Sequence, residues 1–299
     1  MHKTRYNALH LQLQIRPKGP LLIKAGGISA NPALPDMQFV RTHHPDLGET
    51  VYIPGSSLKG VVRSFVEKAL RTWDDQQTWR WACPTFPDES GSCAKRLQDE
   101  TDTATVYRRS CGACRIFGHT RLRGRLSFTD FFPVEEVHTE IRYGVAISRL
   151  THAVAHGPFE MEVAISGAFG GTLVLENFEI WQLGLLTTVL EAINMGLLKV
   201  GFGKNRGFGE VEARIMEVQV EEIVAGYKKD RLRGLLAFVD DGEAKRYSLY
   251  PPAILNELPD PKTETPLGLY VRRNYDAGVW SAIAQQAMQA LVPVGGTSS

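Results

Sequence analysis

The stretch Ile53-Pro-Gly-Ser-Ser-Leu-Lys-Gly-Val-Val-Arg63 contains a proline-glycine turn that leads into a helical pattern. Beyond this turn, apolar residues recur at Leu58, Val61, Val62, Phe65, Val66, Ala69, Leu70 and Trp73. An i, i+3, i+4, i+7 repeat held over four turns predicts an amphipathic helix. Ser56 or Ser57 is expected to cap its first turn, because serine side chains accept the N–H groups at helix starts.

The start of this helix could bind an anion. Ser56, Lys59 and Arg63 lie together beside the apolar stripe, and Gly60 leaves the first turn open to the approach of another backbone. Free N–H groups, hydroxyls and cations at a helix N-terminus favour phosphate. The alternative is an ordinary capped helix with solvated charges.

Composition limits the remaining possibilities. With 299 residues and 43% hydrophobic content, the chain can build one large core or two modest ones. No run approaches the roughly 18 apolar residues of a membrane span, and the N-terminus lacks the apolar core of a signal peptide, so a cytoplasmic protein is expected. The net charge of +1 argues against coating nucleic acid by bulk electrostatics. However, the segment from Arg108 to Arg125 holds six arginines and no acid, which favours a polyanion over a merely solvated face.

Four cysteines fall within one short segment, at Cys83, Cys93, Cys111 and Cys114. Cys111-Gly-Ala-Cys114 is a CxxC pair, and Cys83 and Cys93 could supply the other half of a tetrahedral site. Gathered thiolates in a cytosolic protein favour zinc over disulfides, although buried thiols beside a redox pair are the alternative. A site with four sulfur ligands is structural, since it has no open position. It would stabilise an insertion from about residue 78 to residue 117.

The order of predicted elements indicates an α+β fold with a ferredoxin-like core and long insertions. Strands are predicted near residues 9–15, 126–132, 159–165, 172–180 and 211–215, and a second helix over about 182–198. An irregular segment containing Arg142, Arg149, His152 and His156 is expected to join the second and third strands. Residues 226–279 are not assigned, and the tail from Gly295 is expected to be disordered.

A glycine-rich loop, Gly201-Phe-Gly-Lys-Asn-Arg-Gly-Phe-Gly209, follows the second helix. It matches neither the P-loop nor the dinucleotide fingerprint, because it precedes a strand and no Lys-Ser/Thr pair follows. Backbone N–H groups around Gly203, with Lys204, Asn205 and Arg206 at the tip, could clamp a phosphate backbone. A sharp helix-to-strand turn would also need glycine.

Together, the turn and helix from Ile53 to Arg63, the segment Cys111-Gly-Ala-Cys114-Arg-Ile-Phe-Gly118 and the loop 201–209 resemble the RAMP superfamily of CRISPR-associated proteins. The chain is most similar to the repeated, zinc-containing backbone subunit of type III effector complexes, over residues 8 to 220. That resemblance implies an RRM-like core within residues 1–225, a thumb hairpin at about 138–160, and a C-terminal extension over 226–299. It also implies partners: guide RNA, target RNA, further copies of the chain, other RAMP subunits and a large effector subunit.

The resemblance assigns roles to individual residues. Guide-backbone contacts fall on Ser56, Ser57, Lys59, Arg63, Gly203, Lys204, Asn205 and Arg206, and a thumb contact on Arg149. Many members of the family cut target RNA with an aspartate in the loop after the first strand. Asp36 is the matching candidate and Asp46 the second choice; His43 and His44 lie in the same loop.

These roles leave three functions open. The first is a guide-binding subunit that also cleaves target RNA through Asp36, with a divalent cation such as Mg²⁺. The second is a purely architectural guide-binding subunit. The third is a guide-processing endoribonuclease of the same superfamily, against which the cysteine pair and the thumb-like segment argue.

Overall fold

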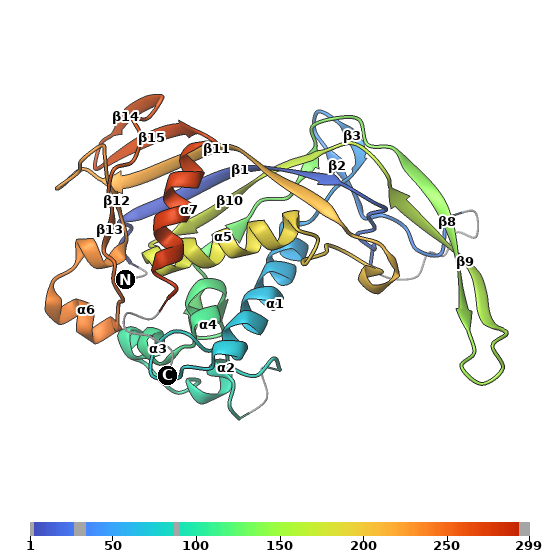
Figure 1. The fold of residues 1–299 in the computed structure, drawn as a ribbon, viewed down its shortest axis with the longest axis horizontal. Helices are drawn as coiled ribbons and strands as arrows, with labels where there is room; N and C mark the ends of the chain where they lie inside the picture. The colour runs from blue at the N-terminus through green and yellow to red at the C-terminus, as the bar shows by residue number, and fades with distance from the viewer. Residues whose placement is uncertain (1–2, 27–33, 87–89, 293–299) are drawn as a thin grey trace.

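The computed structural model describes residues 3–26, 34–86 and 90–292, so the tail from residue 295 lies outside the described part of the chain. A seven-stranded antiparallel sheet forms its centre (Figure 1). β1 (Asn7–Pro17) pairs on one side with β10 (Phe169–Glu176) and on the other with β11 (Val211–Ile223). β6 (Leu126–Phe128) and β7 (Phe132–Pro133) pair with β10 in turn.

Two helices complete the core. α1 (Gly55–Trp73) lies between β1 and β6 in the sequence, and α5 (Ile180–Asn194) connects β10 to β11. The core therefore follows a β-α-β-β-α-β order, with sheet order β11-β1-β10-β6, which is a ferredoxin-like arrangement. Alternation in β1 turns Leu13 and Ile15 towards Leu58 of α1 and Ile193 of α5, and all four side chains are buried. The predicted mixed α+β fold is confirmed.

The cysteine-containing insertion lies between α1 and β6. It contains three short helices, α2 (Cys93–Arg96), α3 (Thr103–Arg109) and α4 (Gly112–Phe117), and the small strands β4 (Gly118–His119) and β5 (Leu122–Arg123). It is tied to the core by Trp79, whose ring stacks on that of Trp181 in α5 at 4.0 Å between centroids. Because the insertion is built from short elements, it needs such anchors to hold its position.

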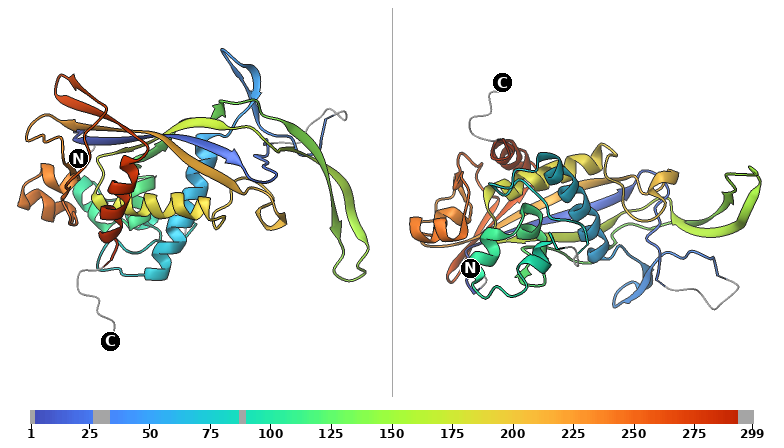
Figure 2. Two further views of the ribbon diagram at one scale, coloured as in Figure 1. Left: turned by 45° about the horizontal axis from the view of Figure 1, so that its top comes forward. Right: turned by 90° about the horizontal axis from the view of Figure 1, so that it is seen from below.

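Two hairpins extend from the sheet. β2 (Arg41–His44) and β3 (Gly48–Val51) pair before α1, while β8 (Thr139–Ile147) and β9 (Val154–Ala164) form a long arm that projects from the body (Figure 2). The residue pattern alone predicts an irregular segment here, which is wrong, because β8 and β9 form a regular hairpin. Its strands pair only with each other over most of their length, so the alternating Tyr143, Val145 and Ile147 remain exposed and do not mark a core face.

The residues after β11 extend the same sheet. β15 (Tyr270–Asp276) pairs with the outer side of β11, and β14 (Thr263–Leu267) with β15. β12 (Leu232–Arg233), the 3-10 helix η2 (Leu235–Phe238), α6 (Asp241–Tyr247) and β13 (Ile254–Leu255) lie between β11 and β14 in the sequence. α7 (Val279–Gln289) packs so closely on α5 that a Cβ at Gly184 would lie 2.5 Å from the Ala287 carbonyl. In the part of the chain that the structure describes, none of the helices combines the length and apolar character that a membrane crossing requires.

Candidate metal centre and RNA-binding surface

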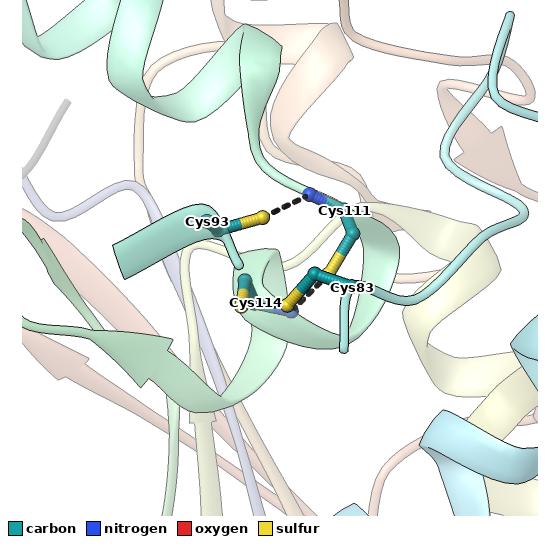
Figure 3. Close-up of side chains that lie close together, drawn as sticks. All are labelled: Cys83, Cys93, Cys111 and Cys114. Carbon is teal, nitrogen blue, oxygen red and sulfur yellow. Dashed lines mark hydrogen bonds between the residues drawn. The ribbon is translucent and has the colours of Figure 1, made fainter. Parts of the chain in front are cut away.

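The four cysteines converge on one buried point within the insertion (Figure 3). Cys83 comes from the chain after α1, Cys93 begins α2, and Cys111 and Cys114 flank the first turn of α4. Their sulfurs lie within 4.8 Å of one another, and Cys83 Sγ is 3.8 Å from Cys114 Sγ. Two sulfurs of a tetrahedral site with Zn–S bonds of about 2.3 Å would lie about 3.8 Å apart.

The local backbone explains why this CxxC pair adopts its position. The N–H of Cys114 donates to Cys111 Sγ at 3.4 Å, and the N–H of Cys111 donates to Cys93 Sγ at 3.3 Å. Only glycine fits at position 112, since a Cβ there would lie 2.2 Å from the Trp79 carbonyl oxygen. The turn is thus packed directly against the chain that leads to Cys83.

The donor chemistry of the cluster suits zinc. Hydrogen bonds among the crowded thiols, from Cys111 first and Cys114 second, lower the pKa of Cys83 and Cys93, and the same contacts raise the pKa of Cys114. A buried set of four sulfur ligands is consistent with a structural zinc ion, which would be fully coordinated by these side chains.

The start of α1 differs in one respect from the prediction. Neither Ser56 nor Ser57 caps the helix: Pro54 occupies the cap position, and the N–H of Gly55 donates to Asp130 Oδ1 at 2.8 Å. Asp130 follows β6 and lies 75 residues after Gly55 in the sequence. The residues around α1 therefore could not predict this hydrogen bond. Ser56 is left exposed in the first turn.

The cations of α1 have different surroundings. Lys59 is half-buried, and its pKa is lowered first by desolvation and then by the charge of Arg63. Arg63 turns inward: its Nε donates to Glu67 at 2.7 Å and its Nη1 to the Gly118 carbonyl at 3.1 Å. The structure therefore engages Arg63 with the insertion, while Lys59 remains on the open side of the helix.

The glycine loop is held against the chain that follows β1. Its central residues Lys204, Asn205 and Arg206 form one exposed 3-10 turn, η1 (Lys204–Arg206). Gly201 and Gly209 both adopt φ of 84°, and a Cβ at Gly201 would lie 2.3 Å from the Leu22 carbonyl. Glycine is required here so that the loop can sit close to a neighbouring backbone.

The glycine loop and α1 bring their positive charges together. The pKa of Lys204 is lowered by desolvation and then by the ammonium group of Lys68 on α1. For both Lys59 and Lys204, the neighbouring charges that perturb the side chain are cations. Arg63 has an acidic partner in Glu67, but no acidic group perturbs the pKa of Lys59 or Lys204, and cations gathered in this way favour an anionic ligand.

Asp36 lies beside the base of the long arm. Its Oδ2 accepts a hydrogen bond from the N–H of Glu160 in β9 at 2.9 Å, and the side chain is exposed. Asp46 lies elsewhere, in the exposed turn of the β2–β3 hairpin, where its N–H donates to His44 Nδ1 at 3.2 Å. Arg149 is exposed in the turn at the tip of the arm. Asp36, Asp46 and Arg149 therefore lie in three different segments, none of which belongs to α1.

Sequence reasoning missed two members of the site, Glu67 and Arg71. Glu67 is buried between Arg63 and Arg71, and Arg71 also donates to the Cys83 carbonyl at 2.9 Å. The i, i+4 spacing of these three residues was a visible signal of the ion pairs. Nothing in the sequence indicated that these residues contact the cysteine insertion.

Comparison with protein families assigns the chain. A model described as the RAMP superfamily matches residues 14–212, which is 199 of the 299 residues. The match runs from within β1 to the start of β11 and includes both the cysteine insertion and the glycine loop. A search of curated proteins found no match. The chain belongs to the RAMP superfamily, and it is accordingly a CRISPR-associated RNA-binding protein.

Proposed function

We propose that this protein is a guide-RNA-binding backbone subunit of a type III CRISPR effector complex, and that it cleaves target RNA with Asp36. In that complex it would contact further copies of itself, other RAMP subunits and a large effector subunit. Its RRM-like core would hold the guide, while base pairing between guide and target would supply the sequence specificity.

One observation carries the RNA-binding part of this proposal. Lys68 of α1 comes close enough to Lys204 on the glycine loop for its charge to lower the pKa of Lys204, so that these two elements bring cations near each other. A folded protein tolerates such repulsion where an anion compensates it. Ser56, one turn before Lys59 on α1, and the exposed turn Lys204–Arg206 offer further hydroxyl and backbone donors.

The β8–β9 arm suits the role of the thumb. It carries exposed apolar side chains, of which Leu150 at the tip is 94% exposed, with Arg149 next to it. Tyr143 is also exposed, at 68%. Apolar and aromatic side chains can insert between bases that have been unstacked, and an arginine can hold the adjoining phosphate.

The proposed cleavage uses the 2′-OH of the target RNA as nucleophile. The 2′ oxygen attacks the adjacent phosphorus, its proton passes to a base, and the 5′ oxygen departs, leaving a 2′,3′-cyclic phosphate. The carboxylate of Asp36 could accept that proton, and a bound divalent cation such as Mg²⁺ would supply compensation for the developing charge. Asp36 lies beside the base of the arm, where its carboxylate accepts a hydrogen bond from the N–H of Glu160 in β9.

A second candidate function is architectural guide binding without cleavage. The hydrogen bond from the N–H of Glu160 to Asp36 favours this architectural function, because the carboxylate then serves to hold its loop against β9. The N–H of Met37 also donates to the Glu160 carbonyl at 3.0 Å, so that Asp36 belongs to a loop bound along β9.

The RNA-binding proposal is tested by removing Lys59, Lys204 and Arg206 together as alanines. Each contact to a single-stranded phosphate contributes roughly 0.7 to the slope of log K against log salt, so that the slope should fall by about 2. The matched control removes Lys95, Lys228 and Lys245, which are exposed elsewhere. Equal RNA affinity and equal salt slope in both variants would contradict RNA binding through Lys59, Lys204 and Arg206.

The cleavage proposal is tested with Asp36→Ala in the assembled complex. Loss of a general base costs on the order of 100- to 10,000-fold in rate, whereas guide and target affinity should remain unchanged. Asp46→Ala tests the second candidate, because it removes the exposed aspartate in the turn of the β2–β3 hairpin. Full cleavage by Asp36→Ala, or loss of cleavage only in Asp46→Ala, would move the catalytic role. No cleavage by the unaltered complex would favour the architectural function.

A further inference from the structure

Three residues of α1 connect the cysteine site to the helix that carries Lys59. Glu67 is only 8% exposed and accepts hydrogen bonds from two arginines, from Arg63 Nε at 2.7 Å and from Arg71 Nη2 at 3.1 Å. A carboxylate this far from water requires such partners. The two arginines lie one helical turn to either side, so Glu67 aligns both along one face of α1.

Each arginine then reaches the cysteine site from a different side. Arg63 donates to the Gly118 carbonyl at 3.1 Å, and its Nη2 lies 3.9 Å from Cys114 Sγ. Arg71 donates twice to the carbonyl oxygen of Cys83, at 2.9 and 3.3 Å. Since Cys83 and Cys114 are neighbours in the cluster, Glu67 indirectly fixes two of the four ligands.

Arginine side chains near the sulfurs can compensate the negative charge that the site would carry with zinc bound. Four thiolates around one Zn²⁺ carry a net charge of −2, which needs compensation in a buried place. Arg63 lies against Cys114, and Arg96 Nη2 lies 3.8 Å from Cys93 Sγ. The two guanidinium groups thus provide opposite charge at two of the four sulfurs, as the outer partners of metal ligands commonly do.

We infer that Glu67 is a positioning residue that couples the cysteine site to α1, so that zinc occupancy raises RNA affinity at the start of that helix. The RNA half of this inference rests on the proposed function. Without metal, nothing holds the four thiolates around one centre. The Cys114 sulfur beside Arg63 and the Cys83 carbonyl that accepts from Arg71 are then no longer fixed in place. α1 would then hold Lys59, one turn from Arg63, in a less defined position relative to the glycine loop.

The test compares Glu67→Gln with Glu191→Gln, an exposed position of α5, in the full-length protein. Zinc affinity is measured by competition with a chromogenic chelator, with and without a single-stranded RNA. We expect Glu67→Gln to weaken zinc binding about 10- to 100-fold and Glu191→Gln to leave it unchanged. In the wild type, RNA should tighten zinc binding by the same factor by which zinc tightens RNA binding, and Glu67→Gln should reduce that factor.

The outcomes separate the two proposals. Unchanged zinc affinity in Glu67→Gln would overturn the positioning role, and a zinc affinity that is independent of RNA in the wild type would overturn the coupling. If the metal-loaded wild type bound no RNA, the proposed function would fail, while the zinc measurement would still decide the role of Glu67. Should Glu67→Gln not fold, Arg71→Gln removes one arm of the same connection and should weaken zinc binding in the same direction.

Discussion

Buried glutamates join segments of this protein that are remote in sequence. Glu162 of β9 accepts from Arg41 at the start of β2, Glu179 before α5 accepts from the Tyr107 hydroxyl in the insertion, and Glu222 of β11 pairs with Arg273 of β15. Ionised carboxylates rarely leave water without partners, so each of these residues specifies which segments meet. Apolar residues build the elements, whereas these charges fix their junctions.

The pH dependence of stability should report on Glu162. Burial opposes its ionisation, but hydrogen bonds from Arg41 and from the Phe39 N–H outweigh burial and lower the pKa of Glu162. A lowered folded-state pKa adds stability above the unfolded pKa, and this stability is lost as the pH falls through the folded value. Hydrogen bonds to charged groups contribute about 1.5–3 kcal/mol. Glu162→Gln should therefore lose about that much free energy of unfolding at pH 7.

Urea denaturation at a series of pH values checks this expectation. The difference between wild type and Glu162→Gln should shrink as the pH falls below the ordinary glutamate pKa, because the protonated side chain then resembles glutamine. Glu136→Gln, an exposed site close to the arm, provides the control. A difference that stays constant down to acid pH would show that Glu162 acts through its shape and not its charge.

At the scale of elements, glycines in two helices lie in opposite packing environments. Gly112 at the start of α4 is surrounded so closely that no Cβ fits, whereas Gly60 in α1 faces open space with nothing within 4 Å of an added Cβ. The first is required by packing. The second weakens the helix without any packing benefit, since glycine costs about 1 kcal/mol relative to alanine inside a helix.

Substituting alanine at each glycine should therefore change stability in opposite directions. Gly60→Ala should raise the free energy of unfolding by about 1 kcal/mol, and Gly112→Ala should lower it, because the backbone of Trp79 must move. If an RNA backbone passes close to the first turn of α1, Gly60→Ala should also weaken RNA binding. Denaturant titration and RNA affinity measured on the same preparations separate these effects; a Gly60→Ala protein that is less stable would contradict the open environment of this residue.

The cysteine insertion should depend on metal more than the sheet does. We expect one zinc ion per chain, and Cys111→Ser should lose it because that residue supplies one of four sulfurs. Hydrogen exchange should then accelerate across the insertion between residues 79 and 125 but remain slow in β1, which is paired on both sides. Elemental analysis that finds no zinc in protein prepared without chelator would exclude the site.

At the scale of the whole molecule, the extension after β11 belongs to the same hydrophobic and hydrogen-bonded body as the core. Arg273 is fully buried, and besides Glu222 it donates to the Lys229 and Arg231 carbonyls at 2.9 and 2.7 Å. Burial raises the pKa of Glu222, against the opposing charge of Arg273. This pair fastens β15 and the preceding loop to β11.

Removing one partner of that pair should destabilise the entire protein. Glu222→Ala leaves Arg273 buried without its carboxylate, a change that typically costs about 3–5 kcal/mol. Replacing both residues, as Glu222→Leu with Arg273→Met, should cost less, because only Arg233, whose Nε lies 3.7 Å from Glu222, is then left without that carboxylate. Urea denaturation of the two variants checks the order; equal losses would indicate that packing and not charge dominates at this junction.

The features that could be predicted from the sequence are those set by neighbouring residues. The alternation of Leu9, Leu11 and Leu13 predicted β1, helical periodicity predicted α1, and the cysteine spacing predicted a cluster that the structure brings together. The capping of α1 by Asp130 could not be predicted, because it depends on a chain reversal 75 residues later. The extension has short strands and few periodic runs, so its place in the sheet is set by tertiary contacts.

The central position of β1 has a consequence for synthesis. Its two partners begin at residues 169 and 211, so β1 leaves the ribosome long before either strand that pairs with it. At about 5–20 residues per second, β1 waits on the order of ten seconds or more with both edges open. During that interval its alternating apolar side chains are available to other nascent chains, including copies of itself on the same messenger. Yield of folded protein should therefore depend on the rate of translation and on chaperones that shield this strand until β10 and β11 arrive.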